Sequence, residues 1–129
     1  EFGHLVETAL FAQRFHEDAR LHYARWGAAG YEVDLIESTA ALKPAMALEI
    51  KWSDRYADKP EDLKGLVRFV RNNKLRESWA TTRSAFGRTA IGEGVLRQWP
   101  AAVLTFHYGA RAVQGRARAG EVRIRGVDA

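Results

Sequence analysis

Residues 44–53, PAMALEIKWS, decide the fold because they combine a strand pattern with a pair of charged side chains. Apolar residues recur there at every second position, which is the period of a β-strand. They are Met46, Leu48 and Ile50. The same period puts Glu49 and Lys51 on one face of the strand, with Ile50 on the opposite, packed face. A strand over about 45–52, introduced by Pro44, therefore ends in a charged pair.

Two further strands are predicted upstream of this one, over 21–26 and 31–36. The residues between them, 27–30, begin and end with glycine, which is typical of a β-hairpin connection, so the two strands are expected to pair antiparallel. Asp34 lies on the second strand, fifteen residues before Glu49. If the strands are neighbours, Asp34 meets Glu49 and Lys51 where the strands end.

The rest of the chain supplies helices and further strands. Apolar periodicity predicts a helix over about 4–19 and a second one over 60–73. Strands are expected over 77–82 and 101–108, with a long irregular connection over 83–98 between them. This order predicts an α/β protein in which a mixed β-sheet is flanked by helices.

Composition narrows the classes of partner and site. With 129 residues the chain has the size of one domain, here placed over 1–108, followed by a basic tail over 109–129 that is either disordered or a peripheral hairpin. Cysteine is absent, so any metal site must use oxygen or histidine ligands. No apolar run approaches the roughly 20 residues of a membrane span, so we expect no membrane contact and a cytoplasmic location. The net charge of +4, carried mainly by arginine, favours a polyanionic partner.

Asp34 and Glu49 form the chemically informative pair. Two carboxylates about 4 Å apart repel by roughly 1 kcal/mol in water and by more inside a protein, unless a cation joins them. Mg²⁺ prefers oxygen ligands and retains waters, which suits two carboxylates with an open face, and Mn²⁺ is the alternative ion. Lys51 beside the ion could hold or deprotonate an attacking water, or offset charge that grows on a phosphate.

Four short motifs resemble a known family. They are Gly3-His4-Leu5-Val6-Glu7, Tyr23-Ala24-Arg25, Glu32-Val33-Asp34 and Ala47-Leu48-Glu49-Ile50-Lys51-Trp52-Ser53. A helix glutamate, a strand aspartate and Glu-x-Lys on the next strand are similar to the PD-(D/E)XK, or restriction-endonuclease-like, nuclease superfamily. More closely, the motifs resemble the nuclease-like C-terminal domain of bacterial and archaeal AAA-type ATPases. The resemblance covers about residues 3–75.

The resemblance implies roles for individual residues. Glu7, Asp34 and Glu49 would be metal-site acids, and Lys51 would be the catalytic lysine. Val33 stands where the name of the superfamily has proline, and the chain contains no GxxxxGK[ST] phosphate-binding loop. An N-terminal ATPase domain would therefore belong to a longer parent chain.

The leading hypothesis is a Mg²⁺-dependent phosphodiesterase, a nuclease domain that acts on DNA. One alternative keeps the fold without catalysis, as a nucleic-acid-binding or protein-interaction module, and another is a toxin-like or defence-associated effector. Arg25 is the candidate phosphate contact, with a purely structural role at the sheet edge as the other interpretation. The sequence assigns no oligomeric state.

Overall fold

A six-stranded mixed β-sheet forms the centre of the computed structural model, which describes residues 2–15 and 21–127. The strands lie in the order β1-β2-β3-β4-β6-β5. Their bounds are β1 Leu21–Trp26, β2 Tyr31–Ser38, β3 Pro44–Glu49, β4 Glu77–Thr82, β5 Gly87–Ile91 and β6 Gly94–Pro100. The β1–β2, β2–β3 and β5–β6 pairs are antiparallel, and β4 is parallel to both β3 and β6. The predicted α/β class with a mixed sheet is confirmed.

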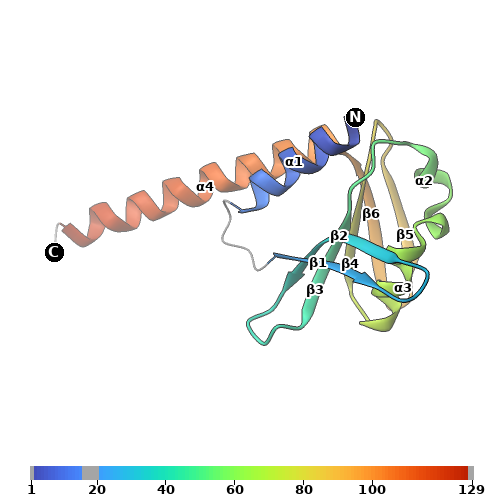
Figure 1. Ribbon diagram of the computed structural model, residues 1–129. Helices are drawn as coiled ribbons and strands as arrows, with labels where there is room; N and C mark the ends of the chain where they lie inside the picture. The colour runs from blue at the N-terminus through green and yellow to red at the C-terminus, as the bar shows by residue number, and fades with distance from the viewer. Residues whose placement is uncertain (1, 16–20, 128–129) are drawn as a thin grey trace.

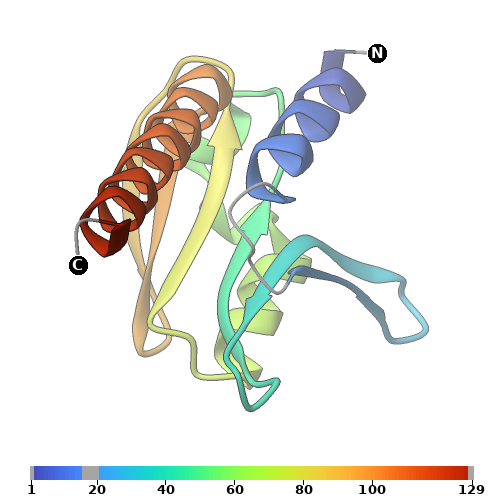
Figure 2. The same ribbon diagram turned by 90° about the vertical axis from the view of Figure 1, so that its left-hand side faces the viewer.

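Helices cover both faces of the sheet. They are α1 Phe2–Phe15, α2 Arg55–Asp58, the short 3-10 helix η1 Pro60–Asp62, α3 Lys64–Asn72 and α4 Ala101–Val127. Figures 1 and 2 show α1 and α4 side by side over one face, while α2 and α3 lie over the other. The molecule is thus built in three layers, with the sheet in the middle.

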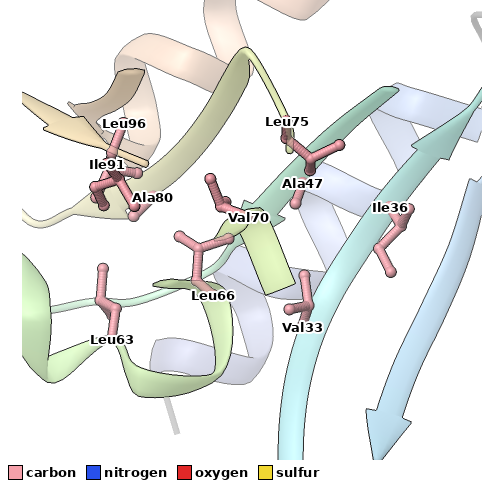
Figure 3. Packing of buried hydrophobic residues seen from close by; sticks show 10 residues of the cluster. All are labelled: Val33, Ile36, Ala47, Leu63, Leu66, Val70, Leu75, Ala80, Ile91 and Leu96. Atoms are coloured by element: carbon pink, nitrogen blue, oxygen red, sulfur yellow. The ribbon is translucent and has the colours of Figure 1, made fainter. Parts of the chain in front are cut away.

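The core between the sheet and α3 contains aliphatic side chains from α3 and from strands β2 to β6 (Figure 3). Leu66 and Val70, four residues apart on α3, are both buried and point onto the sheet, as the helical period requires. The members of this core are Val33, Ile36, Ala47, Leu63, Leu66, Val70, Leu75, Ala80, Ile91 and Leu96. This packing fixes α3 against the end of β2 and β3 that carries the charged residues.

A second core fills the opposite face, beneath α1 and α4. Leu10 of α1 and Leu104 of α4 are completely or almost completely buried against the sheet. The sheet residues in this core are Leu35, Met46, Leu48 and Ile50, and Tyr108 of α4 completes it. Because β3 is covered on both faces, its interior positions are apolar or small until Glu49.

Two predictions downstream of β4 were wrong. The connection expected over 83–98 is the β5–β6 hairpin, in which Gly92 and Glu93 join paired residues Ile91 and Gly94. Gly92 has a φ of 57°, as the first loop position of a type II′ turn requires, and glycine adopts this angle without steric cost. This turn signal, the glycine at position 92, was present in the sequence next to residues with the alternating pattern of a strand.

The strand predicted over 101–108 is instead the start of α4. Ala101, Leu104 and Tyr108 are buried and lie three and four residues apart, which is the spacing of a helix face. The helix continues to Val127, so the hairpin predicted for the tail over 109–129 does not form within the described part of that segment. The side chains of its arginines from Arg116 onward lie outside what the structure describes.

The predictions for the part of the chain up to the end of β4 agree more closely with the structure. The β1–β2 hairpin and the strand over 77–82 are confirmed. The helix predicted over 60–73 is present as η1 followed by α3, separated at Leu63. The first helix is confirmed as far as Phe15, whereas its predicted end at residues 16–19 lies outside the described residues. Within the described chain, no helix combines the length and the apolar character that crossing a membrane would require.

Candidate functional site

An irregularity in β2 positions Asp34. His22 and Ala24 of β1 are two residues apart, but their partners on β2, Ile36 and Val33, are three residues apart. One extra residue therefore occupies the Asp34–Leu35 step, as in a β-bulge, and bulges re-aim side chains. As a result Val33 and Ile36 both join the core under α3, while Leu35 joins the core under α1 and α4.

Glu49 and Lys51 form a close ion pair at the end of β3. The Lys51 Nζ lies 2.8 Å from the Glu49 Oε1, and the exposed fractions of the two side chains are 35% and 10%. The other carboxylate oxygen, Glu49 Oε2, is buried and has no hydrogen-bond partner among the residues that the structure describes. An unpaired buried carboxylate oxygen is costly, because its lost hydration is not replaced.

Side chains from the two neighbouring strands hold the backbone where β3 leaves the sheet. The Ile50 N–H donates to Asp34 Oδ2 over 2.7 Å, from the β2 side. The Lys51 N–H donates to Thr81 Oγ1 over 2.7 Å, and the Thr81 hydroxyl donates back to the Lys51 carbonyl over 2.7 Å, from the β4 side. The fully buried Thr81 thus fixes both backbone groups of Lys51.

The segment that follows Lys51 is fastened a second time through Asp54. Its Oδ1 accepts hydrogen bonds from the N–H groups of Ser84 and Ala85, over 2.7 and 3.0 Å, and its Oδ2 accepts one from the Ser84 hydroxyl over 2.6 Å. The hydrogen bonds from Ser84 and Ala85, with the nearby charge of Arg83, lower the pKa of Asp54 to about 2. This carboxylate is therefore ionised at neutral pH and joins the segment after β3 to the segment after β4.

Burial disfavours charge on both site carboxylates, and nearby acidic groups add to its effect. The pKa of Glu49 is raised, first by burial and then by the charge of Asp34, although Lys51 and a hydrogen bond from the Asp34 backbone oppose the shift. The pKa of Asp34 is raised by burial, against the lowering effect of the Ile50 N–H and of Lys51. Burial lowers the pKa of Lys51, but the hydrogen bond and charge of Glu49 outweigh it, so that the pKa lies above its usual value. Lys51 is consequently a cation at neutral pH.

A small polar hollow of about 250 Å³ opens beside this pair, on the α3 side of the sheet. Glu49 and Lys51 line it from the end of β3, and the first residues of α3 line it from the opposite side. Gly65 lets the start of α3 approach β2 closely, since a Cβ built there would lie 2.4 Å from the Glu32 carbonyl oxygen of β2. The remaining lining residues are Gly30, Tyr31, Glu32, Tyr56, Asp62, Leu63 and Lys64.

The structure therefore brings together three of the predicted site residues, Asp34, Glu49 and Lys51, and leaves two at the periphery. Glu7 of α1 lies 3.7 Å from His4, and its charge acts on Asp34 from a distance. Across residues 2–15 and 21–127, no three acidic or histidine side chains gather into a set that could hold a metal ion. Arg25 is exposed on β1 and pairs with Glu32 at 3.3 Å.

Sequence reasoning missed the residues that hold the site in shape. Thr81 and Asp54 act on the backbone of other segments, and no local pattern announces such long-range hydrogen bonds. The bulge at Asp34 had one detectable sign. The run Val33-Asp34-Leu35-Ile36 breaks strict alternation, because Leu35 and Ile36 are adjacent apolar residues and both are buried.

Comparisons of this chain with protein-family models, with curated proteins and with solved structures give no match.

Proposed function

We propose that this chain is a metal-dependent phosphodiesterase that acts on DNA, with a restriction-endonuclease-like arrangement of Asp34, Glu49 and Lys51. The observation that carries the proposal is the buried Glu49 Oε2, which has no hydrogen-bond partner within the described chain while Asp34 raises the pKa of the same carboxyl group. Glu49 lines an open polar hollow, and Asp34, which does not line it, lies close enough to act on the charge of Glu49; two such desolvated carboxylates fit a divalent cation with oxygen preference.

Mg²⁺ suits the donor set because it is commonly held by one or two carboxylates, with waters and substrate phosphate in the other positions. Asp34 and Glu49 would hold it, and Mn²⁺ is the alternative. When bound, such an ion would polarise a phosphate oxygen and lower the pKa of a bound water. Glu7 is not assigned to the ion in this proposal, because it pairs with His4 on α1; its charge still raises the pKa of Asp34.

Lys51 acts in this proposal as a permanent positive charge. Its raised pKa keeps the ammonium protonated at neutral pH, so it stabilises negative charge that grows on the phosphate and does not remove a proton from water. Thr81 supports that role because it fixes the Lys51 N–H and C=O, which leaves only the side chain free to move toward substrate.

We also propose that the domain serves as the nuclease module of a longer cytoplasmic ATPase.

The test is cleavage of duplex, single-stranded and branched DNA with Mg²⁺ or Mn²⁺. Lys51→Gln should remove cleavage, because the amide can still donate to Glu49 but carries no charge. Lys43→Gln is the matched control, since Lys43 is exposed in the turn before β3 and should leave the rate unchanged. Thermal melts of both variants establish that each is folded. A wild-type protein that cuts none of these substrates contradicts the enzymatic proposal.

A second candidate function is a nucleic-acid-binding module without catalysis. The Glu49–Lys51 ion pair and the Asp34–Ile50 hydrogen bond favour it, because each gives a site residue a structural partner. In that case DNA binding is insensitive to divalent ions, and Lys51→Gln changes stability without changing any reaction.

A further inference from the structure

Three arginines around the polar hollow are each held by a residue that lines it. Arg55 Nη2 of α2 lies 3.5 Å from Asp62 Oδ2. The guanidinium of Arg68 on α3 lies 4.7 Å from the centre of the Tyr31 ring, in a cation–π contact. Arg25 of β1 pairs with Glu32. The lining residues Asp62, Tyr31 and Glu32 therefore set the position of these cations at the rim of the hollow.

Lys64 and Lys51 add positive charge inside the same ring. Both line the hollow, and Lys64 is exposed at the start of α3. Of the three acidic lining residues, Glu32, Glu49 and Asp62, each pairs with one cation, Arg25, Lys51 and Arg55 respectively. Lys64 and Arg68 carry no ion pair to any of these acids, so the lining and its rim together hold an excess of positive charge.

The start of α3 acts in the same direction. Leu63 makes no side-chain capping hydrogen bond to the described first turn, and that turn contains no acidic residue. The partial positive charge of the helix N-terminus therefore adds to the charge of Lys64 at this wall of the hollow. The N-terminus alone would not define a ligand, but here it lies within a ring of cations from β1, α2 and α3.

We propose that Arg25, Arg55, Lys64 and Arg68 form a phosphate-binding rim that guides one nucleic-acid strand across the hollow to Lys51. The exposed arginines come from three separate elements and contact three different lining residues, which suits successive phosphates of a strand better than one small anion. The identity of the strand as substrate rests on the proposed function. Binding through the rim does not, because it needs neither metal nor cleavage.

The experiment measures affinity for short duplex and single-stranded DNA in EDTA at several salt concentrations. The double variant Arg55→Gln with Arg68→Gln should weaken binding to both. Each lost phosphate contact lowers the salt slope by about 0.9 on duplex and about 0.7 on single strands, so two lost contacts lower it by about 1.8 and about 1.4. Inorganic phosphate, added as competitor, should displace the DNA poorly.

The chain offers a closely matched control in Arg76→Gln with Arg97→Gln. Arg76 pairs with Glu93 at 3.5 Å, as Arg55 does with Asp62. Arg97 lies 5.6 Å from the Trp79 ring centre, as Arg68 lies 4.7 Å from that of Tyr31, and Arg97 also pairs with Glu77 at 3.5 Å. Trp79 packs against the core on the α4 face, so Arg97 is on the side away from the hollow. This control should keep the wild-type slope.

Three outcomes overturn the rim. The first is an equal salt slope for the rim variant and the wild type, and the second is an equal loss of salt slope in the Arg76 and Arg97 control. The third is displacement of the DNA by inorganic phosphate that is as effective as displacement by unlabelled DNA. A protein that binds through the rim but never cuts contradicts the proposed function alone. A protein that cuts, with affinity insensitive to Arg55 and Arg68, contradicts the rim alone.

Discussion

Asp34 accepts a hydrogen bond in the structure and would bind metal in the proposed site, and these two roles make different demands on its charge. As an acceptor for the Ile50 N–H it needs only an oxygen, charged or neutral, whereas as a metal ligand it must be an anion. Burial penalises the anion and raises the pKa of Asp34, and its charge in turn raises the pKa of Glu49. Without a cation, the folded protein therefore bears an electrostatic penalty at this site at neutral pH.

The pH dependence of stability should reveal this penalty. A carboxyl whose folded pKa is raised binds its proton more tightly in the folded state, so stability falls as pH rises from the usual values of 3.8 and 4.5 through the raised pKa values. Asp34→Asn should reduce this fall and raise metal-free stability at neutral pH, because asparagine keeps the acceptor for Ile50. The measurement is urea unfolding in EDTA at a series of pH values.

Asp34→Leu is the control for that prediction. It also removes the charge, but it leaves the Ile50 N–H without its acceptor, which costs about 1–3 kcal/mol. The leucine variant should therefore be less stable than the asparagine variant at every pH. A pH profile of Asp34→Asn that coincides with the wild-type profile would exclude the penalty.

At this scale the sequence predicted the three central residues and failed for their supports. The period of two predicted over 45–52 was enough to place Glu49 and Lys51 together, although β3 itself ends at Glu49 and Lys51 lies beyond it. Thr81 lies thirty positions after Lys51, so its hydrogen bonds arise from the parallel pairing of β4 with β3, which no local pattern specifies.

Among the elements, α3 and β2 are the pair whose spacing defines the hollow. Gly65 allows the close approach, because its missing Cβ would meet the backbone oxygen of Glu32 at 2.4 Å, and backbone cannot rotate away as a side chain can. The distance between helix and strand is therefore set by one residue. Sequence reasoning found α3 from its apolar face but gave no reason for this glycine.

Gly65→Ala should destabilise the protein and push α3 away from β2. Overpacking of this kind typically costs about 1–3 kcal/mol, and it more than offsets the better helix propensity of alanine. Gly115→Ala is the control, because a Cβ at that α4 position has nothing within 4 Å among the described atoms, so it should stabilise by up to about 1 kcal/mol. Chemical unfolding measures both. An equal increase in the free energy of unfolding in both variants would contradict the close packing of α3.

Errors in predicting elements had a common physical origin. Segments 83–98 and 101–108 contain short apolar runs, for which strand, helix and loop patterns overlap. The β5–β6 hairpin depended on the positive φ of Gly92, and the start of α4 depended on the burial of Leu104 and Tyr108 beneath it. For α4, tertiary contacts decided between locally similar patterns, whereas the hairpin depended on a local turn signal at Gly92.

In the whole molecule, the helices on one face of the sheet support the site from behind, and the helices on the other face leave it open. Helices α1 and α4 cover one face of the sheet, and their core includes Ile50, the residue between the charged pair. On the other face α2, η1 and α3 leave the polar hollow beside Glu49 and Lys51. The α/β class and the mixed sheet were predictable from the order of elements, whereas the strand order β4-β6-β5 followed only from pairing in space.

The proposed function requires Asp34 and Glu49 to hold a divalent cation, and thermal melts with increasing Mg²⁺ or Mn²⁺ measure that binding without any need for cleavage. Selective binding to the folded state should raise its stability by about 2.7 kcal/mol when the free ion reaches 100 times its Kd. Asp34→Asn and Glu49→Gln should abolish this rise, and Glu7→Gln should keep it, because Glu7 pairs with His4 outside the site. A wild-type melting temperature that ignores both ions, or a rise that persists in Asp34→Asn and Glu49→Gln, would contradict the account.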